Sequence, residues 1–209
     1  MAAHGPHPEA QAGSRPGTDG EGHAVGAKKG ASDDRFTLAF VDECGFAPSQ
    51  PVSYSWAKKG ARRRIPYENP QGKRVNVLAA YCPFGSQPSL SWGLQRGSLV
   101  SEQLVDFVQH LPRPPGKPLV CVLDNGSMHV SGIVKAARET LRQERIYLYY
   151  LPPYSPELND IEAIFGVVKR HELPERRYPT WESLEEAIIT GFTHVEDRLK
   201  PHKQLRRAA

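Results

Sequence analysis

Three acidic residues, Asp42, Asp124 and Glu162, stand where the sequence predicts the end of a strand or the start of a helix. Asp42 follows the apolar run at residues 36–41, and Asp124 follows a second apolar run at residues 119–123. Glu162 falls in the first turn of an expected helix, because apolar residues recur there at helical spacing. Carboxylates brought together repel one another unless a cation lies between them, and hard oxygen ligands favour Mg²⁺ or Mn²⁺. These residue types are therefore suited to metal-assisted phosphoryl transfer.

Each of these acids also has an ordinary structural explanation. An acid at a strand end is common as a solvated turn residue or as a helix cap. The helix dipole favours an acid in a first turn, and Glu157 and Asp160 compete with Glu162 for that role. The acids form a site only if the elements that carry them meet at one edge of a sheet.

The apolar runs predict an α/β fold with a mixed five-stranded sheet flanked by helices. Strands are expected at residues 36–41, 73–81, 89–94, 119–123 and 146–149, and helices at 101–111 with Ser101 as N-cap, at 131–143, from about 159, and after the N-cap Thr180. Three successive strands favour an antiparallel meander, and the alternation of strands and helices that follows favours parallel pairing. If the first and fourth strands are adjacent and parallel, Asp42 and Asp124 lie at the same edge.

Length and composition indicate one folded domain. The 209 residues include 39% hydrophobic residues, which is enough for a core. We expect a disordered tail at 1–34, where apolar periodicity is absent, a folded domain at 35–199 and a basic tail at 200–209. No run reaches the roughly 20 apolar residues of a membrane helix, which disfavours a membrane protein. The three cysteines are far apart and include no C-x-x-C pair, so a structural zinc or a disulfide framework is disfavoured.

Positive charge is concentrated in one segment before the second strand. The formal net charge of +4 permits a polyanionic partner without establishing one. The segment between residues 58 and 74 contains many basic residues and a single acid, Glu68, and Trp56 precedes it by two positions. The basic residues are Lys58, Lys59, Arg62, Arg63, Arg64, Lys73 and Arg74. Such a patch neutralises phosphates and offers a ring for base stacking, which predicts DNA binding; a solvated loop is the alternative.

Three motifs carry a resemblance to a known family. They are VDECGF at 41–46, VLDNGSMH at 122–129 and LPPYSPELNDIE at 151–162. With these motifs, the chain resembles the catalytic domains of DDE-superfamily transposases of the mariner-like group, closest to bacterial insertion-sequence enzymes. Trp56 and Gly60 match the family's Trp-x-x-x-Gly signature.

The resemblance implies a ribonuclease H-like fold over residues 35–199. It implies a site for two Mg²⁺ ions, with Mn²⁺ as a substitute, built from Asp42, Asp124 and Glu162. The implied activity is cleavage and joining of DNA at the ends of a mobile element, by a homodimer that binds transposon-end and target DNA in the cytoplasm, associated with the nucleoid. Lys169 matches a basic residue of the family that follows the third acid.

Other residues of the motifs are candidate accessories. Asn125 and His129 lie in the second motif, and His129 is equally explained as a structural residue at a helix start. Asp160 stands where the family usually has proline, which places an extra acid two residues before Glu162.

The segment before residue 35 lacks the helix-turn-helix pattern that usually precedes this catalytic domain. We therefore expect a separately encoded or lost specificity region. Another nuclease on the same fold and a non-catalytic DNA-binding remnant are the alternative functions.

Overall fold

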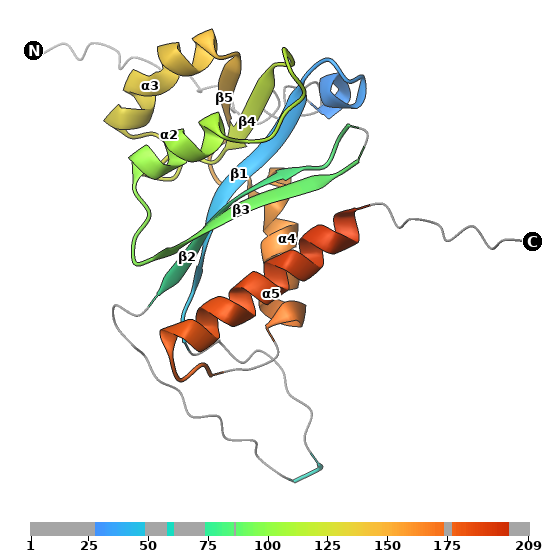
Figure 1. The fold of residues 1–209 in the computed structure, drawn as a ribbon, viewed down its shortest axis with the longest axis vertical. Coiled ribbons are helices and arrows are strands. Elements are labelled where there is room, and N and C mark those ends of the chain that lie inside the picture. The colour runs from blue at the N-terminus through green and yellow to red at the C-terminus, as the bar shows by residue number, and fades with distance from the viewer. Residues whose placement is uncertain (1–27, 49–57, 61–73, 86, 174–176, 201–209) are drawn as a thin grey trace, which may run out of the picture.

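The computed structural model describes residues 28–48, 58–60, 74–85, 87–173 and 177–200. A single sheet runs through this part of the chain, with helices packed on both faces (Figure 1). The strands are β1 Thr37–Phe46, β2 Val75–Cys82, β3 Ser89–Arg96, β4 Leu119–Leu123 and β5 Ile146–Tyr150. The helices are α2 Ser101–Gln109, α3 Gly132–Gln143, α4 Ile161–Val167 and α5 Trp181–Leu199, with a 3-10 turn at Pro156–Leu158 and a π-helical turn at Val168–Glu172.

The strand order is β3-β2-β1-β4-β5, which confirms the mixed five-stranded sheet expected from the sequence. β1, β2 and β3 pair antiparallel, whereas β1 pairs parallel with β4, and β4 pairs parallel with β5. The strand that carries Asp42 is therefore central, with β4 beside it.

Two apolar cores lie on opposite faces of the sheet, because side chains alternate along each strand. On β1, Leu38 and Phe40 belong to the core beneath α4 and α5, while Ala39 and Val41 belong to the core beneath α2 and α3. By the same alternation Asp42 faces the side of α4, which is the helix that carries the third acid.

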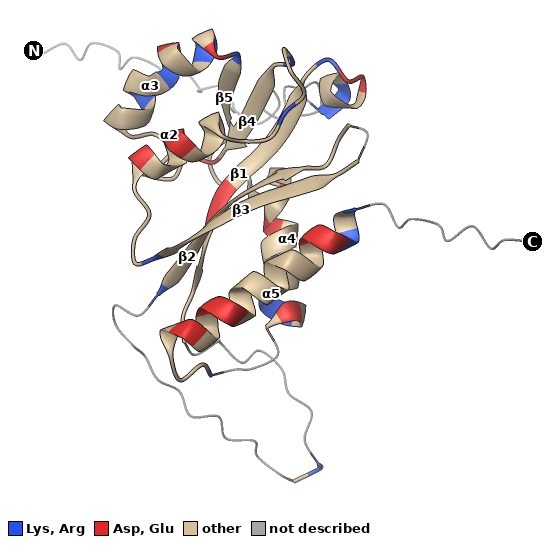
Figure 2. Cartoon of the chain, in the orientation of Figure 1, with Lys and Arg blue, Asp and Glu red and all other residues tan. Residues whose placement is uncertain are grey.

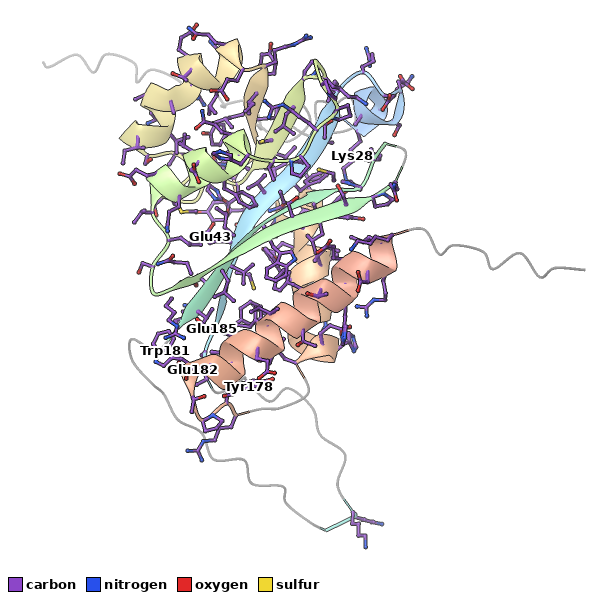
Figure 3. The ribbon with its side chains drawn as sticks, in the orientation of Figure 1. Lys28, Glu43, Tyr178, Trp181, Glu182 and Glu185 are labelled. Atoms are coloured by element: carbon purple, nitrogen blue, oxygen red, sulfur yellow. The ribbon has the colours of Figure 1, made fainter. Side chains whose placement is uncertain are left out.

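The long helix α5 is fastened to the sheet at its middle and at its start. Phe192 is fully buried and packs edge-on against Phe46, with ring centroids 6.2 Å apart. At the helix start, where Figure 3 labels Trp181 and Glu185, the Arg96 guanidinium of β3 donates to Glu185 at 2.6 and 2.7 Å and lies over the Trp181 ring. The predicted cap Thr180 is confirmed, since its side chain accepts from Ser183 N at 3.1 Å.

Three local predictions are corrected by the structure. β1 continues through Asp42 to Phe46, because the pairing with β2 extends to Phe46↔Val75. Ser101 is the first residue of α2 rather than its N-cap, because its hydroxyl donates to Met128 O at 2.9 Å instead of receiving a helix N–H.

The third correction concerns the expected N-terminal tail. Residues 28–32 are helical, and Ala31 is buried. Gly30 allows this close approach, since a Cβ there would lie 2.7 Å from the Phe36 ring. This packing was not predicted, because Gly30 and Ala31 are small and the segment has no large apolar residue that would indicate a core. Residues 1–27 and 201–209 lie outside the described residues.

In the described ranges, no helix has the length and apolar character needed to cross a membrane.

Candidate active site

The register between β1 and β4 brings the first two acids to one level. The last residue pair of this parallel ladder is Phe40↔Val122. Asp42 and Asp124 each follow two residues later, where the two strands separate. The expectation that both acids lie at one edge of the sheet agrees with this placement.

The Asp42 carboxylate is buried, with 7% of the residue exposed, and it is held at both oxygens. Oδ1 accepts from its neighbour Glu43 N at 2.8 Å, and Oδ2 accepts from Asn159 Nδ2 at 2.9 Å. Burial raises the pKa of Asp42 to about 7, and repulsion from Asp124 and Glu43 adds to this rise, against the backbone hydrogen bond and the attraction of His129. A cation bound at this carboxylate would favour its charged form and lower the pKa again.

The Asp124 carboxylate is oriented by the turn that follows β4. Its Oδ1 accepts from Gly126 N at 2.7 Å and from His129 Nδ1 at 2.5 Å. Because a carboxylate only accepts, this nitrogen carries the proton. A Cβ on Gly126 would lie 2.9 Å from Asp124 Oδ1, so glycine leaves room for this arrangement. The Asn125 side chain donates to Leu151 O at 2.7 Å, which ties the turn to the segment after β5.

His129 is fully buried between two acids. Its Nε2 lies 3.0 Å from Glu43 Oε2, outside hydrogen-bond geometry, so this contact is an ion pair. Burial opposes the charged ring, but the contacts with Glu43, Asp124 and Asp42 outweigh it and raise the pKa of His129 to about 9. Contact with His129 in turn lowers the pKa of Glu43.

Sequence reasoning missed Glu43, which Figure 3 labels on β1. The only signal was an acid directly after Asp42 on a strand, and its partner His129 lies far along the chain.

Glu162 and Asp160 are separated by the start of α4. Glu162 is exposed in the first turn and lines the same pocket as Asp42 and Asp124. Asp160 instead accepts from Lys28 Nζ at 2.7 Å and is not among the residues that line the pocket. Asn159, which the sequence analysis did not single out, reaches the pocket in its place.

The pocket has a volume of about 460 Å³ and is lined by two kinds of residue. The polar part of the lining, called the acidic wall below, consists of the three acids, Asn125, Gly126 and Asn159, and the rest is the proline-rich segment 151–156. Acids from three elements therefore meet in one open space.

The donor set fits a hard divalent cation. Ligand atoms of Asp42, Asp124 and His129 lie within 4.8 Å of one another, and the Glu162 carboxylate completes the acidic wall. Asn159 Oδ1 is buried without a hydrogen-bond partner among the described residues. Carboxylate and amide oxygens are ligands that Mg²⁺ and Mn²⁺ accept. Because His129 already contacts Asp124 and Glu43, we assign it to orienting Asp124 rather than to the metal.

Few of the predicted DNA-binding residues can be placed. Trp56, Arg62, Arg63, Arg64 and Lys73 lie outside the described residues. Lys58, Lys59, Arg74 and Lys169 are exposed. The Arg74 guanidinium covers Gly45, the third residue after Asp42, and the Lys169 ammonium lies 5.6 Å from the centre of the Phe46 ring.

The fold and the acidic pocket define a domain suited to metal-assisted phosphoryl transfer, and comparison with known proteins identifies its family. Residues 37–185 match the model of the DDE superfamily endonuclease family. The chain belongs to this superfamily.

Individual relatives are similar to the chain in sequence or in fold. The chain is 29% identical over 96 residues to the transposable element Tc3 transposase of Caenorhabditis elegans, a match over 46% of this chain and 27% of that protein. The Mos1 strand transfer complex superposes with a TM-score of 0.60 at 17% identity, over 86% of this chain and 53% of that one. The mariner Mos1 paired-end complex with Mg gives 0.61 at 17% identity over 95% and 61%, and the complex with Mn gives 0.61 at 20% identity over 86% and 54%.

These superpositions confirm the ribonuclease H-like fold. The chain spans about a quarter of the length of the curated relative and little more than half the length of the solved ones.

Proposed function

We propose that this chain is the catalytic domain of a transposase that cleaves DNA strands and transfers them at the ends of a mobile element. The observation that carries this proposal is the convergence of Asp42, Asp124 and Glu162 on one pocket in a DDE-superfamily domain. We assign these three acids as metal ligands for two Mg²⁺ ions, which Mn²⁺ can replace.

The roles of the chain's own residues follow from their contacts. Asp42 and Asp124 hold their carboxylates at one level of the sheet, and Glu162 approaches from α4. Asn159 and Gly126 fix carboxylate orientation through hydrogen bonds, and bound Mg²⁺ supplies activation of the attacking water or 3′-hydroxyl and stabilisation of the leaving oxygen.

The wider setting of this activity is also a proposal. Relatives were solved as a strand transfer complex and as paired-end complexes, so we propose that this chain acts as a homodimer on transposon-end and target DNA. Its resemblance to bacterial insertion-sequence enzymes favours a cytoplasmic, nucleoid-associated protein. Terminal inverted repeats flanking its reading frame would test the assignment to an insertion sequence.

The test is metal-dependent cleavage of DNA that carries the ends of the element. Wild type is expected to cleave and join strands with Mg²⁺ or Mn²⁺ and to stop when EDTA is added. Asp42→Asn, Asp124→Asn and Glu162→Gln should each abolish both steps, while Asp106→Asn on α2 serves as a control with an exposed acid outside the pocket.

The outcomes separate the alternatives. Cleavage without joining identifies another nuclease on this fold, and binding without cleavage identifies a non-catalytic remnant. If Glu162→Gln retains turnover and Asp160→Asn loses it, Asp160 replaces Glu162 as the third ligand.

A further inference from the structure

Tyr154 lines the acidic pocket, yet none of the roles assigned above uses it. Its side chain is fully exposed, at 101%, the highest value among the large hydrophobic residues described. Within the part of the chain that the structure describes, it has no hydrogen bond and no ring contact. Tyrosine rings usually bury most of their area, so this ring is available for an external partner.

The backbone holds the ring out at a cost. Tyr154 has φ of 59°, in the left-handed region that bulky residues avoid. It stands between Pro153 and the Ser155-Pro156 pair, and these prolines restrict the neighbouring dihedrals. Because no contact of the ring offsets the strain, the conformation matches strained residues that serve a site.

The two kinds of lining residue suit different parts of a nucleotide. The wall formed by Asp42, Asp124 and Glu162 suits cations and, through them, phosphate oxygens. The other lining residues, 151–156, offer three prolines, a leucine and the Tyr154 ring. A strand whose phosphate reaches the acids brings a base within reach of this segment, and aromatic rings bind unpaired bases by stacking.

We propose that Tyr154 forms a base-stacking subsite, which holds an unpaired nucleobase beside the phosphate bound at the acidic wall. This inference rests on the proposed action on DNA and adds a requirement to it: the strand is unpaired next to the bond that is cut. The residue positions substrate and takes no part in proton or metal chemistry.

The direct test uses fluorescence of a base. A forked DNA duplex with 2-aminopurine in its unpaired arm is bound to the full chain in Ca²⁺, which is expected to support binding without cleavage. Wild type and Tyr154→Phe, which keeps the ring, should quench the fluorescence. Tyr154→Leu should not quench it and should bind the fork about ten-fold more weakly, as expected for the loss of one stacked base.

A second variant separates this role from a structural one. Tyr154→Gly removes both the ring and the left-handed strain, so its melting temperature should equal or exceed that of wild type while cleavage with Mn²⁺ falls about ten-fold. A structural tyrosine would lose stability and activity together. Tyr147→Ala is the matched control, because Tyr147 is an exposed tyrosine on β5 that does not line the pocket; it should bind and cleave like wild type.

Two results would overturn the inference. One is quenching and affinity in Tyr154→Leu equal to wild type. The other is a shift in sedimentation of Tyr154→Leu with unchanged DNA binding, which would make the ring a contact between copies of the chain. Failure of wild type to cleave DNA would contradict the proposed function instead. The quenching experiment does not depend on cleavage, so the two outcomes can be told apart.

Discussion

At the scale of single residues, the site is a set of carboxylates whose orientation depends on small neighbours and on one buried histidine. Asp42 is the most strongly perturbed of these acids, because it is both buried and close to Asp124 and Glu43. Asp124 is accessible, and it depends on Gly126 and His129 for its orientation. Each dependence leads to a measurable expectation.

The first prediction concerns Asp42→Asn in metal-free protein. Because the folded-state pKa of Asp42 is raised to about 7, the folded protein binds a proton that the unfolded chain has released between the ordinary pKa and pH 7. The stability that protonated Asp42 contributes is complete below about pH 4 and is lost as the pH rises through 7. Asparagine removes this loss, and its amide can donate to the unpartnered Asn159 Oδ1.

We therefore expect Asp42→Asn to melt above wild type by several degrees at pH 8 in EDTA, with the difference shrinking toward pH 4. Thermal melts across this range decide the question. A variant that melts below wild type at pH 8 would show that the carboxylate is not destabilising in the absence of metal.

The second prediction concerns Gly126→Ala. Its Cβ would lie 2.9 Å from Asp124 Oδ1 and 3.5 Å from His129 Nδ1, so the carboxylate must move although the fold need not. We expect Mn²⁺ binding, measured by calorimetry or paramagnetic resonance, to weaken about ten-fold or more. Gly132→Ala is the control, since a Cβ there meets nothing within 4 Å. Equal affinities for both variants would contradict the role of the turn.

At the scale of elements, the sheet sets the level of Asp42 and Asp124, and α4 must be pressed against the sheet to deliver Glu162. α5 contacts the π-helical turn that continues α4, where Val168 lies beside Gly191. The aromatic cluster of Phe192 with Phe46, Phe165 and Trp92 joins α5 to α4 and to the sheet. The third acid therefore depends on packing well outside the pocket.

The third prediction follows from this packing. Phe192→Ala should cost about 3–5 kcal/mol of the free energy of unfolding, as expected for a buried aromatic residue. Ile189→Ala on the same helix should cost less than about 0.5 kcal/mol, because Ile189 is 46% exposed. Urea unfolding curves measure both. A small effect of Phe192→Ala would mean that the sheet holds α4 without α5.

At the scale of the whole molecule, charge is unevenly distributed. The exposed face of α5 carries a row of acids, visible in Figure 2. They are Glu182, Glu185, Glu186, Glu196 and Asp197. The basic segment predicted to bind DNA lies between β1 and β2 in the sequence. We therefore expect phosphates to be bound by that segment and not along α5.

The fourth prediction tests this arrangement. Replacing Arg62, Arg63 and Arg64 together by alanine should weaken binding to all duplex sequences and flatten the dependence of log K on log salt by about two to three, near 0.9 per lost phosphate contact. Replacing Arg96, which is paired with Glu185 and Glu182 on the acidic side, should leave this slope unchanged. An unaltered slope in the triple variant would make the segment a solvated loop.

The amino-acid sequence by itself determined the five strands and the helices α2 to α5, because their signals are local, whereas the helical residues 28–32 were not predicted. Apolar runs marked all five strands, helical spacing marked α2 and α4, α3 was expected between the fourth and fifth strands, and Thr180 marked the start of α5. The positions of Asp42 and Asp124 after apolar runs predicted that they meet on the condition that the two strands are adjacent and parallel, and the observed pairing of β1 with β4 meets that condition.

Only the tertiary structure decided which polar side chains touch, because those contacts join residues far apart in the chain. Lys28 pairs with Asp160 across 132 residues, and Asp160 does not line the pocket, whereas Asn159 and Glu162 do. The contact of Glu43 with His129 and the burial of Ala31 depend on the register of β1 and on close backbone approach. Neither of these leaves a periodic pattern in the sequence, because each is set by the way separate elements pack.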